Sequence, residues 1–151
     1  MKEAVLPALA LEVQDASRSI DVPTARSLRA WCRAALRKDC AVTMRIVGKP
    51  EGATLNEQFR GKDYPTNVLT FVYESRPACV GDIVLCAPVV RTEARQQGKA
   101  LRAHWAHLVV HGMLHLQGFD HETPAQARRM ERLEKQILSE LGYPDPYVVA
   151  A

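Results

Sequence analysis

The stretch LRAHWAHLVVHGMLHLQGFDH, residues 101–121, predicts a long helix and the turn that ends it. Apolar residues recur at helical spacing from Leu101 to Leu116. Gly118 is well placed to end the helix, because glycine adopts positive φ without steric cost. Residues 103–119 carry no formal charge, but four histidines and Gln117 lie among them. This composition is not typical of a transmembrane helix, and we expect no membrane association.

Three histidines in this stretch have the spacing of metal ligands. His111 and His115 are four residues apart, so both rings leave one helix face about 6 Å apart along the axis. The turn QGFD can bring His121 back toward the same ion. Three neutral imidazoles with one open position are typical of a catalytic zinc site. The sequence therefore predicts Zn²⁺ on His111, His115 and His121.

Neighbouring side chains allow other arrangements. His107 precedes His111 by four residues. A trio of His107, His111 and His115 would separate its outer rings by about 12 Å of helix rise, too far for one ion. We therefore expect His107 to be a neighbour of the site or a core residue, and His104 to lie on the surface. Asp120 and Glu122 flank His121, where either could orient an imidazole or face water.

Gly112 stands where zinc proteases with the motif H-E-x-x-H-x-x-G-x-x-H carry their catalytic glutamate. That glutamate takes a proton from the zinc-bound water and passes it to the leaving amine. Glycine can do neither. A metal ion alone still lowers the pKa of bound water to about 7, and phosphodiester cleavage depends less on a glutamate at this position. The pattern therefore disfavours proteolysis.

Composition indicates one ordinary globular domain over residues 1–151. The chain is 47% apolar and 25% charged, with a net charge of +3, which permits an anionic partner without requiring one. Glu3 and Pro7 interrupt any apolar leader at the N-terminus. The four cysteines form no C-x-x-C pair and are expected to be buried and reduced. These features favour a cytoplasmic protein.

The flanking sequence predicts an α+β fold, with a small mixed sheet of about four strands packed against helices. The last helix has a capping box, because Thr123 precedes Pro124 and Gln126, and Gly142 ends it. Strands are expected at residues 8–14, 41–48, 66–74 and 82–90. Further helical segments are expected at about 23–38, as a short helix or turn at 54–61, and from Thr92 onward with an interruption at Gly98.

Two long motifs resemble those of a known family. HGMLHLQGFDH is similar to the H-G-x-L-H-L-x-G-[YF]-D-H signature of the YbeY family, the bacterial rRNA maturation factors. LNEQFRGKDYPTNVLTF, residues 55–71, resembles that family's L-N-x-x-[YF]-R-x-K-D-x-P-T-[DN]-V-L-[ST]-F block. GDIVLCAPVV, residues 81–90, is similar to its G-D-I-[VY]-[IL] strand. The chain departs from the second block at Val72, where many members have proline; this position is at a strand end and not in the chemistry.

The resemblance implies an α+β zinc-dependent endoribonuclease specific for single-stranded RNA. It implies a role in 16S rRNA 3′-end maturation and ribosome quality control, with rRNA and the ribosome or small-subunit proteins as partners. By motif position His111, His115 and His121 carry over as metal ligands. Arg60 carries over as the functional arginine. The general base stays open among Asp120, Glu122, a metal-bound hydroxide and the RNA 2′-hydroxyl.

Basic residues offer candidate phosphate contacts. A guanidinium is always charged and can grip a phosphate with two hydrogen bonds, so Arg60 could hold the scissile group. The alternative is a structural salt bridge from Arg60 to Asp63 or Glu57. Four further arginines recur at helical spacing and form either a solvated face or an RNA track: Arg26, Arg29, Arg33 and Arg37.

Two other functions stay open from the sequence. The first is a non-catalytic ribosome assembly factor in which zinc is structural. The second is a metalloprotease-like hydrolase, which Gly112 disfavours. The in vivo metal is also open, because a site of three histidines accepts nickel, cobalt or copper as well.

Overall fold

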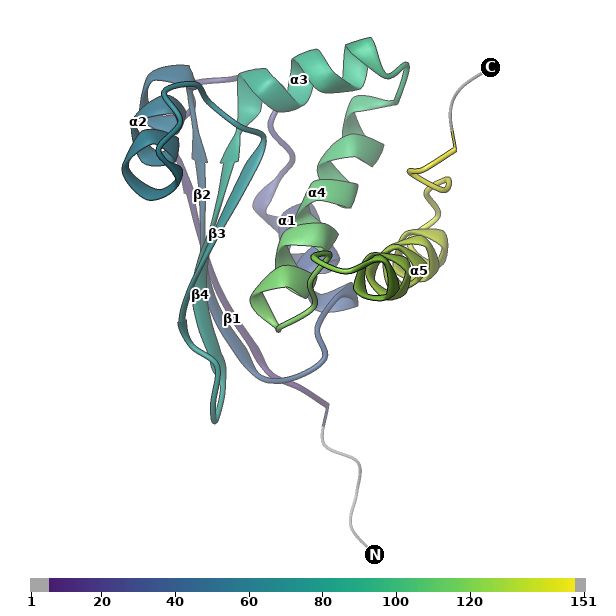
Figure 1. The fold of residues 1–151 in the computed structure, drawn as a ribbon. Helices are drawn as coiled ribbons and strands as arrows, with labels where there is room; N and C mark the ends of the chain where they lie inside the picture. Colours follow the sequence, from purple (N-terminus) through teal and green to yellow (C-terminus); the bar gives the residue numbers. More distant parts are fainter. Residues whose placement is uncertain (1–5, 149–151) are drawn as a thin grey trace, which may run out of the picture.

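A mixed four-stranded sheet is the centre of the fold in the computed structural model, which describes residues 6–148 (Figure 1). The strand order is β1-β2-β4-β3. The first three strands in that order are parallel, and β3 runs antiparallel to β4 at the edge. This arrangement confirms the predicted α+β class. The strands are β1 (Leu9–Asp15), β2 (Cys40–Val47), β3 (Val68–Glu74) and β4 (Cys79–Cys86).

Helices cover the two faces of the sheet unequally (Figure 1). They are α1 (Ala25–Ala34), α2 (Lys49–Arg60), α3 (Ala87–Gln96), α4 (Leu101–Leu116) and α5 (Pro124–Glu140). In Figure 1, α1, α4 and α5 lie on one side of the sheet, with α4 next to the strands. α2 lies on the other side near one end, which leaves part of that face without a helix.

Side-chain alternation along the strands separates the main core from the face away from α4. On β2, Val42, Met44 and Ile46 are buried among the helices. Thr43 and Arg45 alternate with them and point the other way, because successive strand residues face opposite sides. α4 is buried on nearly all sides, which explains its weak amphipathic pattern. A smaller core under α2 includes Val47, Leu69, Val84 and Cys86.

Several element boundaries differ from the prediction. The expected strand at 82–90 ends at Cys86, and the APVV segment begins α3, because Pro88 fits the first turn of a helix. An apolar run of this length does not distinguish a buried strand from a buried helix. The first helix covers Ala25–Ala34 and not 23–38, whereas the segment expected at 54–61 begins earlier, at Lys49.

Other local predictions are confirmed. The Thr123 capping box is present, and glycines with positive φ follow α3, α4 and α5 at Gly98, Gly118 and Gly142. All four cysteines are buried and free. No helix within residues 6–148 combines the length and the apolar character needed to cross a membrane.

Candidate metal centre

The predicted histidine trio comes together at the end of α4. His111 and His115 project from the same side of the helix with parallel rings whose centroids are 6.4 Å apart. The chain reverses at Gly118, which has a φ of 104°. His121 thereby returns to lie 5.8 Å from His111 and 6.0 Å from His115, between ring centroids. The three rings thus surround a common space.

Within the part of the chain that the structure describes, the group of donor atoms that could hold a metal ion differs by one residue from the predicted trio. His115, Asp120 and His121 each offer a ligand atom, and these atoms lie within 4.8 Å of one another. Asp120 therefore lies beside the two imidazoles and is not simply turned toward water. Its carboxylate also accepts a hydrogen bond of 2.7 Å from the backbone N–H of His121, which fixes the turn. Imidazole nitrogen and carboxylate oxygen are both ligands that zinc accepts, so these residues fit such an ion.

Glu134 on α5 holds the ring of His111. Its Oε1 lies 3.0 Å from Nδ1 of His111 and 2.9 Å from Nε2 of His107. Tyr147 donates its hydroxyl to the other carboxylate oxygen at 2.7 Å. Burial favours a higher pKa for Glu134, but the bonds from the two histidines and Tyr147 outweigh it and lower that pKa to about 2.

The ionised state of Glu134 determines which nitrogen of His111 can bind a metal. An ionised carboxylate only accepts hydrogen bonds, so Nδ1 of His111 must carry the proton. Nε2 then keeps its lone pair, as a ligand requires. A carboxylate behind a ligating histidine fixes ring orientation in many metal sites. Glu134 was not predicted from the sequence, although one signal was present: it occupies the buried stripe of α5 with Met130, Ile137 and Leu138.

His115 is suited to bind metal in its neutral form. Burial and the charges of His111 and His121 lower its pKa, against the opposing effect of Asp120. A ligating imidazole must be unprotonated, so a lowered pKa keeps His115 available at neutral pH. Its Nδ1 is buried and has no hydrogen-bond partner.

The histidines open onto a cleft of about 580 Å³. Its lining includes six consecutive residues, 66–71, which lead into and along β3. Successive strand residues point to opposite faces of the sheet. Because residues of both faces line the cleft, β3 presents its edge to the cleft. Phe59 and Arg60, at the end of α2, line the cleft together with Asp120 and Glu122. The exposed Arg60 has no ion pair with Asp63 or Glu57.

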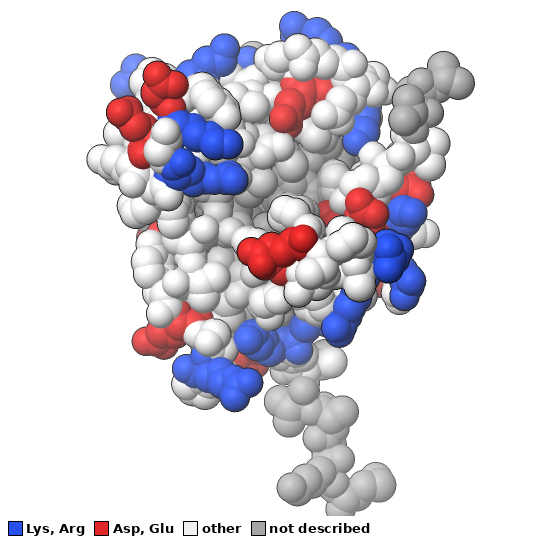
Figure 2. Space-filling model, in the orientation of Figure 1, with Lys and Arg blue, Asp and Glu red and all other residues white. Residues whose placement is uncertain are grey.

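Charged side chains of both signs lie on this face of the molecule. In Figure 2, basic side chains gather beside the α2 region at the upper left with acidic ones next to them, and a further acidic group lies near the centre. The surface between them is hollowed. A cation on one wall and carboxylates near the histidines are compatible with an anionic substrate held beside a metal ion.

Gly112 packs against the sheet and not toward open space. A Cβ at this position would lie 3.3 and 3.4 Å from two methyl carbons of Ile83, and 3.6 Å from a methyl carbon of Thr70. A glutamate at position 112 would therefore begin in the contact between α4 and the strands. Gly112 permits close packing of helix and sheet, which gives a structural reason for glycine at the position where the proteases carry glutamate.

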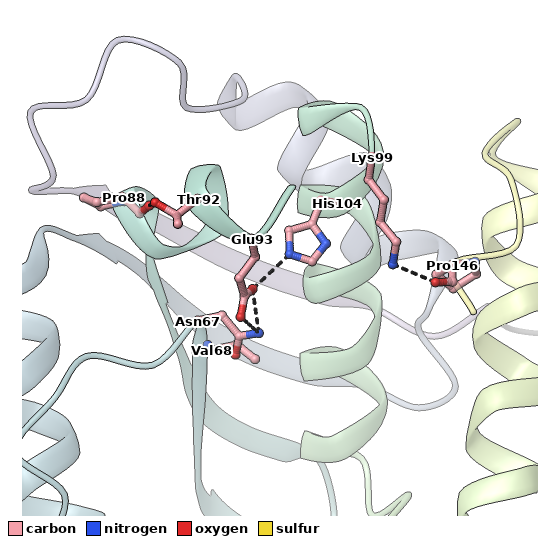
Figure 3. Close-up of polar contacts among 8 residues, drawn as sticks. All are labelled: Asn67, Val68, Pro88, Thr92, Glu93, Lys99, His104 and Pro146. Atoms are coloured by element: carbon pink, nitrogen blue, oxygen red, sulfur yellow. Dashed lines mark hydrogen bonds and ion pairs between the residues drawn. The ribbon is translucent and has the colours of Figure 1, made fainter. Parts of the chain in front are cut away.

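A second, half-buried carboxylate connects the elements around the cleft (Figure 3). Glu93 on α3 accepts hydrogen bonds of 3.0 Å from Asn67 Nδ2 and from Nε2 of His104 on α4. These bonds connect the start of β3 to two helices. His104 is only 4% exposed, so its predicted surface position is wrong. Glu93 explains the difference, because a buried imidazole needs such a partner.

The prediction that four arginines share one helix face is also incorrect. α1 ends at Ala34, so Arg37 lies outside the helix that carries Arg26, Arg29 and Arg33. The Arg37 side chain instead donates to the carbonyls of Ala34 and Leu36 at 3.3 and 3.1 Å, which satisfies groups at the helix end. None of the four arginines lines the cleft onto which the three histidines open, the metal cleft.

Fold and site together define a candidate metalloprotein of the α+β class, with histidine ligands at an open cleft. The family model described as Endoribonuclease YbeY matches residues 12–142, and the chain belongs to that family. An endoribonuclease YbeY from Aromatoleum aromaticum is 57% identical over 142 residues, covering 92% of each chain. One from Methylobacillus flagellatus is 54% identical over 142 residues, covering 94% of this chain and 95% of the relative.

A solved structure supports the fold independently. The solution structure of a protein from Thermotoga maritima superposes with a TM-score of 0.56 over 91% of this chain and 99% of the other. The two sequences are 24% identical, so this likeness concerns the fold alone.

Proposed function

We propose that the chain is a zinc-dependent endoribonuclease that cleaves single-stranded RNA. Family membership makes it an RNA-hydrolysing enzyme. The observation that carries the finer proposal is the placement of Arg60 and the histidine cluster on one cleft. We further propose that it acts in the cytoplasm on the 3′ end of 16S rRNA and in ribosome quality control, with the ribosome or small-subunit proteins as partners.

His111, His115 and His121 would hold the zinc ion in this proposal, with Asp120 beside them. When bound, zinc lowers the pKa of water and polarises a phosphate oxygen. Glu134 keeps His111 in the tautomer that presents Nε2. Arg60 extends from the end of α2 and would grip the scissile phosphate, since a guanidinium pairs with two phosphate oxygens.

Residues of the same cleft could carry out proton transfer. Asp120 and Glu122 are the carboxylates that line it. Either could take a proton from the attacking group, which is a water molecule or the RNA 2′-hydroxyl. Leaving-group protonation is less demanding for a phosphodiester than for a peptide, so a site without a glutamate at Gly112 suits RNA.

The test is cleavage of a labelled single-stranded RNA by zinc-quantified protein. His115→Ala and Arg60→Ala are purified in parallel with the wild type. We expect His115→Ala to lose both zinc and cleavage. Arg60→Ala should keep zinc near the wild-type content but lose cleavage by about 10²–10³-fold, as for removal of one transition-state donor. Arg60→Lys should recover part of the rate, because it keeps the charge but not the paired hydrogen bonds.

Two outcomes would contradict the proposal. Equal cleavage by wild type and His115→Ala would place the chemistry elsewhere or indicate a contaminating nuclease. Zinc binding and RNA binding without cleavage by any preparation would favour the non-catalytic assembly factor.

A further inference from the structure

An exposed aromatic ring stands at the mouth of the metal cleft. Phe59 is 61% exposed although it is a large apolar side chain. It directly precedes Arg60, and both line the cleft. The exposed ring is therefore available to a partner, and covering it would remove apolar surface from water.

The ring of Phe59 is held in place by its neighbour on β3. Its centroid lies 4.7 Å from that of Phe71, and the ring planes meet at 63°. This edge-to-face contact limits movement of the ring without covering it. Phe59 therefore offers a preorganised aromatic surface, with a smaller entropy cost on binding than a free side chain has.

The same two rings join the metal cleft to a second cavity. Phe59 and Phe71 line both the cleft and a cavity of about 370 Å³ on the sheet face away from α4. Tyr73 also lines the second cavity, 63% exposed, and its hydroxyl donates to Asp82 at 2.6 Å. Arg45 in this cavity is already paired with Glu51. The second cavity thus adds aromatic surface but no free positive charge.

An unpaired nucleotide matches this combination of groups. Its phosphate suits Arg60, and its base has a flat π face that stacks on an aromatic side chain. In a duplex each base face is already stacked on its neighbours, so a double strand cannot offer it to Phe59. A single strand can also follow the aromatic surface from the metal cleft toward Tyr73.

We propose that Phe59 is a stacking platform for one unpaired base of the RNA and that it gives the site its preference for single strands. The inference rests on the proposed function, because it takes RNA as the substrate of this cleft. Arg60 holds the phosphate while Phe59 holds an adjacent base. The strand then continues over Phe71 toward the second cavity.

The first experiment measures binding by the zinc-loaded full chain. The probe is a fluorescent single-stranded 2′-O-methyl RNA, the readout is anisotropy, and a denaturing gel after each titration checks that the probe is intact. Phe59→Leu keeps apolar packing on Phe71 but removes the aromatic face, and we expect it to raise Kd by about 5- to 150-fold. Phe59→Trp should bind within about 3-fold of wild type, because indole also stacks.

A matched control is Tyr64→Ala. Tyr64 is 53% exposed and close in sequence, yet it lines neither cavity. We expect its Kd to stay within about 2-fold of wild type, a change of about 0.4 kcal/mol. Equal losses in Tyr64→Ala and Phe59→Leu would overturn the assignment to Phe59.

Abasic probes test stacking directly. One base at a time is removed from the probe while every phosphate is kept. At one position we expect the wild type to lose affinity and Phe59→Leu to lose almost none, because the variant has no stack to break. If every abasic probe weakened both proteins equally, stacking on Phe59 would be ruled out.

Cleavage assays with unmodified RNA separate this inference from the proposed function. Cleavage by the wild type with unchanged KM in Phe59→Leu would overturn the platform and leave the activity standing. The predicted binding pattern without cleavage by any preparation would support the platform and contradict the proposed function. The ratio of the cleavage rate on single-stranded RNA to that on duplex RNA should be smaller for Phe59→Leu than for the wild type.

Discussion

At the scale of single residues, Glu134 connects α5 to the candidate metal centre. It is 1% exposed and bonded to His107, His111 and Tyr147. A buried carboxylate without partners would be costly, so these donors make its ionised form possible. In return, the carboxylate fixes the tautomer of His111. The orientation of this predicted ligand thus depends on a residue of a different helix.

Removing the charge of Glu134 should weaken metal binding. In Glu134→Gln, the amide can donate to His111 as well as accept, so the ring loses its constraint. We expect zinc affinity to fall by about 10- to 100-fold, measured by competition with a chromophoric chelator. Glu140→Gln, near the end of the same helix and exposed, is the control and should bind zinc as the wild type does. Unchanged affinity in Glu134→Gln would contradict the role given to this carboxylate.

Glu134 should also make stability depend on acid pH. Its pKa falls from the ordinary value of 4.5 to about 2 in the folded chain, against the effect of burial and because of bonds from His107, His111 and Tyr147. The unfolded chain therefore binds the proton more readily. The stabilisation is complete above about pH 4.5 and is lost as pH falls toward 2.

Urea unfolding with chelator present, from pH 6 to pH 2.5, measures this effect. Glu134→Gln should be less stable than wild type at pH 6, and the difference should shrink below pH 4.5. A constant difference across the whole range would show that ionisation of Glu134 makes no contribution.

The sequence could predict the histidines because their spacing alone places them. His111 and His115 are fixed by one helical turn, and Gly118 allows His121 to return. Glu134 could not be assigned a role in this way. Its pairing with His111 depends on how α5 packs on α4, and no local spacing encodes that packing. A charge in the buried stripe of a helix was the available signal.

At the scale of elements, the close approach of α4 to the sheet depends on Gly81. A Cβ on this residue of β4 would lie 2.4 Å from the Phe71 carbonyl oxygen on β3 and 2.8 Å from Cδ2 of Leu116 on α4. The first contact involves backbone, which cannot yield without moving a strand. Gly81 therefore sets the separation of β3, β4 and the end of α4, next to His115.

Gly81→Ala should destabilise the fold by about 1–3 kcal/mol, the usual cost of overpacking a core. Chemical denaturation of the purified variant measures this difference in unfolding free energy. Gly48→Ala is the matched control, because a Cβ there meets its nearest atoms at 3.8 and 3.9 Å. It should cost less than about 1 kcal/mol, since only the N-cap of α2 changes. A Gly81→Ala variant as stable as wild type would disprove the close contact.

The elements themselves were predictable to different degrees. α5 carries its own start signal in Thr123 and Gln126, so local chemistry determines where it begins. The boundary between β4 and α3 was missed because the run from Ile83 to Val90 is apolar in both elements. The buried position of His104 was missed for a similar reason: its partner Glu93 lies on another helix, outside any local pattern.

At the scale of the whole molecule, the cleft is assembled from parts far apart in the sequence. Arg60 ends α2, β3 supplies one wall, and the histidines come from α4 and its turn. The family resemblance placed Arg60 and the histidines in one site, and the structure puts both on the same cleft. Phe59 required the structure, because exposure and contact with Phe71 are properties of packing.

The proposed metal ligands come from α4 and from the turn that follows it. Metal binding would hold the two together and should stabilise the folded chain as a whole. A ligand that binds only the folded state adds about 2.7 kcal/mol at a hundred times its Kd. For a chain of this length we expect Tm to rise by about 5–10 °C on zinc loading and to fall again with chelator, measured by scanning calorimetry. His115→Ala should lose this response. His104→Gln should keep it, because His104 bonds to Glu93 and does not line the cleft. If His115→Ala gained as much as the wild type, the stabilising zinc would bind outside the histidine cluster, and the proposed ligand set would be wrong.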